Sequence, residues 1–483
     1  MERLLILAID QGTTGTTCLV VDEGFHVLGR GYRTIRQHFP RPGWVEHDPE
    51  ELCESVFTAA ADALRDAEVP AAELRAIGIA NQRETTLLWE RRSGAPVHRA
   101  IVWQDRRTAE RCRRLPRELI RERTGLLPDP YFSATKLEWL LENAAGEHRL
   151  GELAFGTVDT WLVWKLTGGR AHVTDVSNAS RTMLLDLARL DWDDDLLELF
   201  CVPRELLPEV RSSSEIVAEV EFLGAKVPIA GLAGDQQAAL FGQACHAAGE
   251  AKATYGTGGF VLVHAGGRLE RPPEGLLLTA ACRLLGRPVE YALEGSIFVA
   301  GAALQWLRDE LGLIEDVAET EALARSLDGN GGVYFVPAFV GLGAPHWAPD
   351  ARGLISGLTR GSARAQLARA ALEAIGYQTR DVLEAAAVPV GALRVDGGVA
   401  ANGFAMQFQA DILGVPVEVA AEREATALGA AGLAGLATGI FPGRDELASK
   451  WRCGARFEPS LEQKDADRLQ AQWRLAVARA LHG

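Results

Sequence analysis

The chain has few cysteines, no basic tail and no long apolar run, and each scarcity excludes a class of protein. Its seven cysteines are an odd number without a CxxC pair, so we expect reduced thiols in a cytoplasmic protein rather than disulfides or a zinc element. The formal net charge of −15 argues against nucleic-acid or membrane-surface partners, because both bind positive surfaces. Segment 425–440 comes nearest to a membrane span, but it is short and rich in Ala and Gly, which favours a tightly packed soluble helix.

The common nucleotide-binding sequences are also missing. The dipeptide Gly-Lys does not occur, so there is no Walker A loop, and no GxGxxG follows a predicted strand. Protein-kinase catalytic-loop and HExxH patterns are absent as well. Any bound polyphosphate must therefore be held by another kind of loop.

Two glycine- and threonine-rich turns are candidates for that loop. An apolar run ends in Asp10-Gln11-Gly12-Thr13-Thr14-Gly15, and Tyr255-Gly256-Thr257-Gly258-Gly259 lies between apolar, β-rich segments. Residues with small side chains let backbone N–H groups approach phosphate oxygens. Asp10 can hold Mg²⁺ directly or through water. Two such turns in one chain predict a phosphate site that is divided between them.

The order of predicted elements indicates two domains. A chain of 483 residues is too long for one core. Strand-like runs followed by helices fill the first half, and the same order restarts after residue 250 or so. We therefore predict two related α/β domains facing a cleft, 1–245 and 246–483, with the boundary near 242–250.

Some elements within these domains can be placed from local signals. Pro49 predicts the first residue of a helix. Helices are also expected near 105–114 and over about 297–311, the second capped by Ser296. The stretch 326–362 is long for a connection inside a compact domain, which favours a functional or interdomain loop.

Two acids at strand ends are candidates for phosphoryl-transfer chemistry. Asp235, with Gln236 beside it, follows the apolar strand 227–232, much as Asp10 follows the first strand. An acid at a strand end is equally often a capping group. Phosphoryl transfer to an alcohol, however, needs one acid for the metal and another to accept the hydroxyl proton. This pairing favours Asp10 for the metal and Asp235 for the acceptor.

The polar run Asn81 to Thr86 follows another predicted strand. In isolation it would be a solvated turn, but Arg83 and Glu84 can donate to and accept from neighbouring hydroxyls of a polyol. Aromatic residues, each of which alone is typical of a core, can form the apolar wall for its carbons. The candidates are Trp103, Tyr131 and Phe260.

A third glycine-rich turn suits the base or phosphates of a nucleotide. Asp396-Gly397-Gly398 follows a strand, and Asn402 opens the next helix. A tight turn with an Asn cap is the alternative interpretation. Together with Gly301 and Gln305, the turn can form an adenosine pocket.

The chain resembles the FGGY carbohydrate kinases over essentially its whole length, and within them the glycerol kinases. Two family signatures are readable, at 131–139 and 353–373. The other matching segments are 10–14, 42–49, 81–86, 129–133, 156–161, 234–240, 255–258 and 394–398.

The resemblance implies an actin-like, ribonuclease H-like ATPase fold in which two domains close over a cleft. ATP with Mg²⁺ would phosphorylate the 3-hydroxyl of glycerol, and the enzyme would be a homo-oligomer, a dimer or tetramer. The implied glycerol contacts are Arg83, Glu84, Trp103, Tyr131, Gln236, Phe260 and Asp235, the last acting as base. The implied nucleotide contacts are Thr13, Thr14, Gly15, Thr257, Gly301, Gln305, Gly398 and Asn402, and Asp10 is the metal-associated acid.

Two positions depart from the family pattern. Thr17 stands where most glycerol kinases carry Arg, so a cation near the phosphates is missing and we expect altered ATP affinity or turnover. Segment 222–226 is shorter than the loop that binds fructose 1,6-bisphosphate in some bacterial members, so this effector is not expected to act here.

Two other functions remain open from the sequence. A pentulose or other sugar kinase of the same family would share the phosphate turns, but it usually lacks the run at 81–86 and the Tyr131 environment. A non-enzymatic, nucleotide-gated actin-like module would explain the turns and the cleft, but not the residues suited to a polyol.

Overall fold

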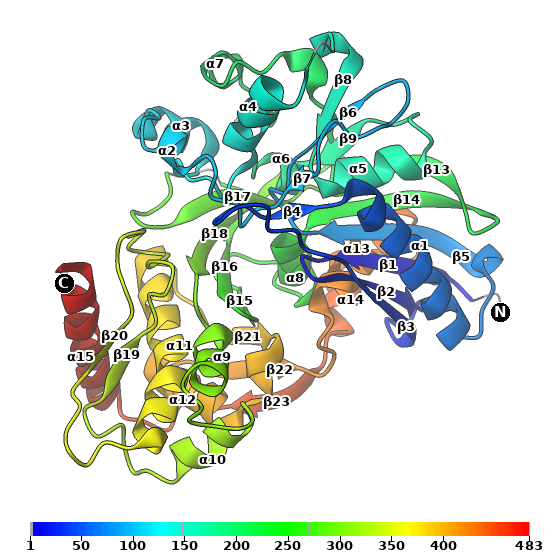
Figure 1. Ribbon diagram of the computed structural model, residues 1–483. Helices are drawn as coiled ribbons and strands as arrows, with labels where there is room; N and C mark the ends of the chain where they lie inside the picture. The colour runs from blue at the N-terminus through cyan, green and yellow to red at the C-terminus, as the bar shows by residue number, and fades with distance from the viewer. Residues whose placement is uncertain (1–2, 147, 269–270, 483) are drawn as a thin grey trace.

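Two mixed β-sheets form the framework of the computed structural model, which describes residues 3–146, 148–268 and 271–482 (Figure 1). The first sheet has the strand order β13-β14-β5-β1-β2-β3 and the second β17-β18-β16-β15-β21-β22-β23. The first contains β1 (Leu5–Gln11), β2 (Gly15–Val21), β3 (Val27–Thr34), β5 (Leu74–Asn81), β13 (Ser214–Phe222) and β14 (Ala225–Gly234). The second contains β15 (Ala251–Tyr255), β16 (Gly259–Gly266), β17 (Leu277–Cys282), β18 (Glu290–Ile297), β21 (Leu393–Asp396), β22 (Val417–Ala420) and β23 (Cys453–Phe457).

The two sheets repeat one topology. In the first, β1, β2 and β3 are successive antiparallel neighbours, and β5 and β14 extend the sheet from β1 in parallel. In the second, β15, β16 and β18 take the same three places, and β21 and β22 extend the sheet from β15 in parallel. The prediction of two related α/β domains is confirmed by this repeat.

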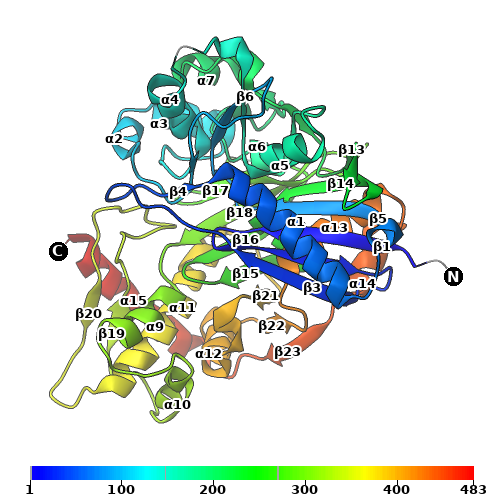
Figure 2. The ribbon, with the colours of Figure 1, turned by 45° about the vertical axis from the view of Figure 1, so that its right-hand side comes forward.

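Helices cover both sheets, and a further group of helices and short strands projects above the first sheet (Figures 1 and 2). The helices are α1 (Pro49–Asp66), α2 (Ala109–Cys112), α3 (Arg117–Thr124), α4 (Ser133–Asn143), α5 (Val158–Leu166), α6 (Val176–Ala179), α7 (Asp194–Leu199), α8 (Asp235–Gly242), α9 (Gly301–Asp309), α10 (Glu319–Arg325), α11 (Arg364–Ala386), α12 (Gly403–Leu413), α13 (Ala425–Ala437), α14 (Arg444–Ser449) and α15 (Gln463–His482). The short strand pairs are β4 (Glu46–His47) with β7 (Ala100–Ile101), β6 (Leu87–Glu90) with β8 (Leu153–Gly156), β9 (Val173–Asp175) with β12 (Glu209–Arg211), β10 (Leu185–Asp186) with β11 (Asp191–Trp192), and β19 (Tyr334–Val336) with β20 (Leu354–Ser356).

Helix α13 explains the membrane-like segment of the sequence. It returns from the second half of the chain to the first sheet, where it packs on β1, β5 and β14 and beside α8. A Cβ on Gly78 would lie 2.2 Å from the carbonyl oxygen of Ala430, so small residues are required at this contact. The helix is apolar on all sides because almost all of it is buried. Among the described residues, no helix has the length and apolarity to cross a bilayer.

Three local predictions need correction or refinement. Ser296 is not a helix cap but part of β18, opposite Phe260. Helix α9 begins only at Gly301, where the N–H groups of residues 300–302 donate to carbonyls of the turn at 256–258. The helix expected near 105–114 is reduced to α2, because Asp105 accepts hydrogen bonds from Val45 and holds its segment as a turn.

The loop-rich stretch 326–362 has an apolar side within the second domain. Its β19–β20 pair packs against α11 and α15, with Tyr334 and Val336 in one cluster with Tyr377 and Trp473. This part of the stretch therefore belongs to a hydrophobic core and does not connect the domains.

Candidate active site

Arg83 and Glu84 follow directly on β5, and both side chains are buried where the two domains meet. Arg83 Nη2 donates to the hydroxyl of Tyr131 at 2.8 Å, and its Nε lies 3.4 Å from a carboxylate oxygen of Asp235. Burial works against the charged guanidinium, but the surrounding acids, Glu294 above all, raise the pKa of Arg83 well above its usual value. Residues predicted from separate stretches of the chain are thus in contact.

The predicted aromatic wall is also assembled. The ring of Trp103 lies 5.5 Å from that of Tyr131 and 6.2 Å from that of Phe260, centroid to centroid. The indole N–H of Trp103 donates to the hydroxyl of Thr13 at 2.8 Å. One side chain therefore contacts the aromatic wall and the first glycine–threonine turn at once.

Asp235 is the first residue of α8 and lies beside a buried lysine. Its side chain keeps 28% exposure, whereas that of Arg83 keeps 1%, so part of the carboxylate is open to solvent. Burial raises the pKa of Asp235, and the charges of Arg83 and Lys252 oppose that rise. Lys252 Nζ donates to Gln236 Oε1 at 2.5 Å and to Thr254 Oγ1 at 2.9 Å. Gln236 is thereby fixed next to the candidate base.

Three charged residues at this site were missed by sequence reasoning. Lys252 on β15, Glu294 on β18 and Arg181 after α6 are all fully buried. Each interrupts an apolar or uncharged stretch of sequence, and an isolated charge in a predicted buried strand was the signal available for Lys252 and Glu294.

Asp10 is the penultimate residue of β1 and lies in a region of converging acids. Burial raises its pKa well above the usual value, and the charges of Asp235, Glu424 and Asp396 raise it further. Within the described ranges, no three acid, histidine or cysteine side chains are grouped closely enough to hold a metal ion.

The two predicted phosphate turns occupy equivalent places in the two sheets. Residues 12–14 join β1 to β2, closed by a Gly12 N–H to Gly15 carbonyl bond of 2.9 Å. Residues 256–258 join β15 to β16, closed in the same way by Gly256 and Gly258 at 2.9 Å. Thr13, Thr14 and Gly15 thus belong to one turn and Thr257 to its counterpart.

The glycines of the expected adenosine pocket also converge. Gly301 donates to the carbonyl of Gly256 at 3.0 Å, and a Cβ on it would lie 3.5 Å from a side-chain carbon of Val399. A Cβ built on Gly398 would have no atom within 4 Å, so there is open space next to this residue. Asn402 caps α12 by accepting a hydrogen bond from the N–H of Ala405, which agrees with the alternative interpretation of this turn as a capped helix start. Gln305 lies one turn along α9 from Gly301.

Two sequence-family models account for most of the chain. The N-terminal domain of the FGGY family of carbohydrate kinases matches residues 5–242, and the C-terminal domain of the same family matches residues 251–438. The chain belongs to the FGGY family. The resemblance inferred from the sequence is confirmed.

Individual members of the family give a finer comparison. The chain is 53% identical to glycerol kinase 2 of Thermotoga maritima, covering 99% of this chain and 98% of that protein. It is 52% identical to a glycerol kinase of Stenotrophomonas maltophilia, covering 100% and 99%. The crystal structure of Plasmodium falciparum glycerol kinase with ADP superposes with a TM-score of 0.93 at 36% identity, covering 99% and 98%. A xylulose kinase of Rhodospirillum rubrum shares the fold, with a TM-score of 0.86 at 24% identity and 98% coverage of both chains.

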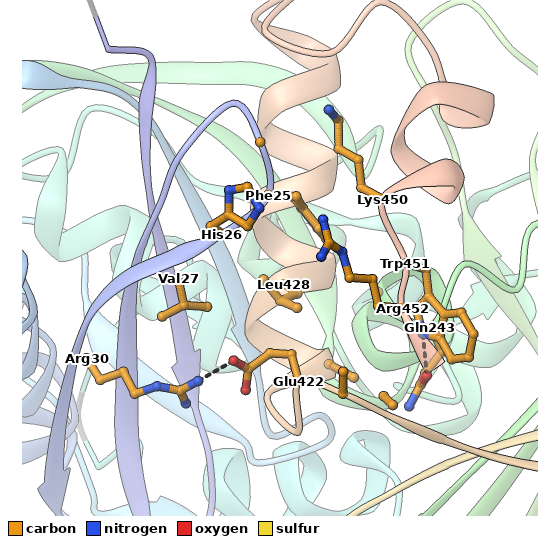
Figure 3. A pocket seen from close by; sticks show the side chains of 15 residues that line it. Phe25, His26, Val27, Arg30, Gln243, Glu422, Leu428, Lys450, Trp451 and Arg452 are labelled. Carbon is orange, nitrogen blue, oxygen red and sulfur yellow. Dashed lines mark hydrogen bonds and ion pairs between the residues drawn. The ribbon is translucent and has the colours of Figure 1, made fainter. Parts of the chain in front are cut away.

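This FGGY kinase also has a cavity of about 350 Å³ between the β2–β3 hairpin, the start of α13 and segment 450–452 (Figure 3). Arg30 forms an ion pair with Glu422 at its edge, and the indole of Trp451 donates to Gln243. None of the predicted site residues lines it. The cavity is therefore distinct from the predicted substrate site.

Proposed function

We propose that this protein is a glycerol kinase, which transfers the γ-phosphoryl group of ATP to the 3-hydroxyl of glycerol and yields sn-glycerol 3-phosphate. The observation that carries the proposal is the contact of Arg83 with both Tyr131 and Asp235 beside an aromatic wall. It provides hydroxyl partners, a surface for carbons and a base within one small site. The relatives of highest identity described above are glycerol kinases aligned over nearly the full chain, which argues against a pentulose kinase.

The proposed roles follow from position. Asp235 accepts the proton of the attacking hydroxyl, since its carboxylate is partly exposed beside Arg83 and burial raises its affinity for a proton. Arg83, Glu84 and Gln236 bind the glycerol hydroxyls. The wall of Trp103, Tyr131 and Phe260 contacts the glycerol carbons and excludes water.

The nucleotide is proposed to lie between the two domains. Thr13, Thr14 and Gly15 on one side and Thr257 on the other bind its phosphates. Mg²⁺ associated with Asp10 would neutralise charge on the transferring phosphoryl group. The adenosine is proposed to contact Gly301, Gln305, Gly398 and Asn402.

Further features of the proposal concern the whole molecule. We propose that 1–245 and 246–483 are two bodies that close on substrate, with α13 packed on the first. All seven cysteines are free thiols, which supports a cytoplasmic location. A homo-oligomer, dimer or tetramer, is proposed from the family resemblance.

A coupled assay with a panel of acceptors tests the function. The purified full-length protein should consume ATP with glycerol in strong preference to dihydroxyacetone and xylulose, and only with a divalent cation. Preference for a pentulose would assign the protein to a different branch of the family. ATP hydrolysis that does not respond to any polyol would favour the nucleotide-gated module.

A further inference from the structure

Four buried charged side chains form a ring around the proposed acceptor end. Arg181 Nε lies 2.6 Å from Glu84 Oε1, and Arg181 Nη2 lies 2.8 Å from Glu294 Oε1. Glu294 also takes bonds of 2.5 and 3.1 Å from the two terminal nitrogens of Arg83. Arg83 Nε in turn lies 3.6 Å from Glu84 Oε1, which closes the ring. All four side chains are almost completely buried.

The ring joins the two halves of the protein. Arg83 and Glu84 follow β5 of the first sheet, whereas Glu294 lies within β18 of the second. Glu294 and Arg83 are 211 positions apart in sequence. A buried ion-pair network is weak evidence of stabilisation, because the loss of hydration offsets most of the attraction. A role in setting the charge of the site explains better why ions occupy these positions.

The charges of the ring cancel. With both carboxylates ionised, Arg83 and Arg181 contribute two positive charges, and Glu84 and Glu294 two negative ones. Burial raises the pKa of Glu84, and the charges of Arg83 and Arg181 oppose that rise. Burial alone would raise the pKa of Glu294, but Arg181 and Arg83 hold it at about 2, so this carboxylate stays ionised at any working pH. The charged residues next to the ring, Asp235 and Lys252, are also one negative and one positive.

Glu294 acts through the arginines. Both of its carboxylate oxygens are taken by Arg83 or Arg181, and Ser296 Oγ lies 3.4 Å from one of them. Without Glu294, two guanidinium groups would share one carboxylate, and the site would carry an excess positive charge. Paired guanidinium groups with free donors are a good receptor for a carboxylate.

We propose that Glu294 is a specificity-determining residue: by neutralising Arg83 and Arg181 it makes the acceptor site take neutral polyols and reject a carboxylate of the same size, such as glycerate. This inference rests on the proposed glycerol kinase function. Glu294 is a positioning residue in that reaction, because it sets the direction and free charge of Arg83 rather than contacting the reacting atoms.

Glu294→Gln is the direct test, since it keeps the shape and removes the charge. Competitive inhibition by glycerate against glycerol should strengthen at least about tenfold, equal to about 1.4 kcal/mol. The KM for glycerol should rise while kcat changes less. Glu373→Gln is the matched control, because Glu373 is also a buried carboxylate, paired at 2.7 Å with Arg369 on α11. It should leave the ratio of glycerate to glycerol affinity unchanged.

A second variant tests the opposite sign. Arg181→Gln leaves the ring with an excess negative charge, so inhibition by the cationic analogue 3-amino-1,2-propanediol should strengthen about tenfold and glycerate should remain excluded. This arm keeps the proposal testable if Glu294→Gln does not fold. The wild-type enzyme gives a third arm, because it should bind glycerol far more tightly than either charged analogue.

The outcomes distinguish the role of Glu294 from the proposed glycerol kinase function. Turnover of glycerol with unchanged charge selectivity in the folded variants would overturn the role of Glu294 and leave the proposed function intact. Tight binding of glycerate by the wild-type enzyme would also overturn it. Absence of glycerol turnover in the wild-type enzyme would instead reject the proposed function.

Discussion

Asp10 lies directly opposite Thr17 in the antiparallel ladder between β1 and β2. Directly paired residues on neighbouring strands point to the same face of the sheet, so the side chain of residue 17 is next to the carboxylate. The family's usual arginine at this position would therefore lie beside Asp10. In this protein the neighbour is a neutral hydroxyl. Burial raises the pKa of Asp10, and the charges of nearby acids raise it further.

Thr17→Arg should reverse part of this effect. A guanidinium next to Asp10 lowers the pKa of that carboxyl and adds a donor near the proposed phosphates, so the KM for ATP should fall by about tenfold, as for a hydrogen bond to a charged group. Steady-state kinetics with varied ATP measure the change. Thr17→Leu, which adds bulk without charge, is the control and should not lower the KM. An equal effect of both substitutions would mean that packing rather than charge is responsible.

Asp235→Asn should lower kcat by about 10²–10⁴-fold, the usual contribution of a general base. Binding of ADP, measured by calorimetry, should change little, because the proposed nucleotide contacts lie on other elements. Wild-type kcat should also fall with decreasing pH through a pKa above the usual value of an aspartate, since burial raises the pKa of Asp235. Asp411→Asn is the control, because Asp411 lies on α12 and accepts its hydrogen bonds from Gln407, Ser460 and Leu461, none of which belongs to the proposed site. Retained turnover in Asp235→Asn would transfer the role of base to another group.

Much of the site could be predicted because its local signals are strong. Asp10 near the end of one buried strand, Asp235 directly after another, and the glycine-rich turns after β1 and β15 each have a short-range pattern with a physical reason. Arg83 and Glu84 were found for the same reason, as a polar run after an apolar strand.

The partners of these residues could not be predicted, because their contacts depend on tertiary structure. Nothing near Glu294 in sequence indicates that it will meet Arg83 and Arg181, and the position of Lys252 beside Gln236 depends on how α8 packs on β15. Ser296 was misassigned as a helix cap because its pairing with Phe260 extends β18 to Ile297, where the helix was expected to begin.

Lys252 should produce an alkaline limit to activity. Its ammonium group is buried, which lowers its pKa to about 8, partly opposed by Asp396 and Asp235. Above about pH 8 the group loses its charge beside Asp235, so kcat/KM should fall. In Lys252→Met the activity should be lower at every pH, and this alkaline decline in kcat/KM should vanish.

Lys136 is the alternative source of such a decline. It has a similarly lowered pKa of about 8 but donates to three backbone carbonyls at or next to Tyr131. A decline that persists in Lys252→Met and vanishes in Lys136→Met would belong to Lys136.

Gly429→Ala should destabilise the contact between α13 and α8. A Cβ at Gly429 would lie 1.8 Å from the carbonyl oxygen of Ala238, and no side-chain rotation can relieve a clash with backbone. Overpacking of this kind costs about 1–3 kcal/mol, so the urea midpoint of unfolding should fall. Because Asp235 begins α8, kcat should fall as well.

Gly391→Ala is the control. A Cβ at this position meets no atom within 4 Å, so the substitution should leave both the urea midpoint and kcat unchanged. If the midpoint fell while kcat held, α8 would tolerate displacement of α13, and the placement of Asp235 would depend on β14 and Arg83 alone.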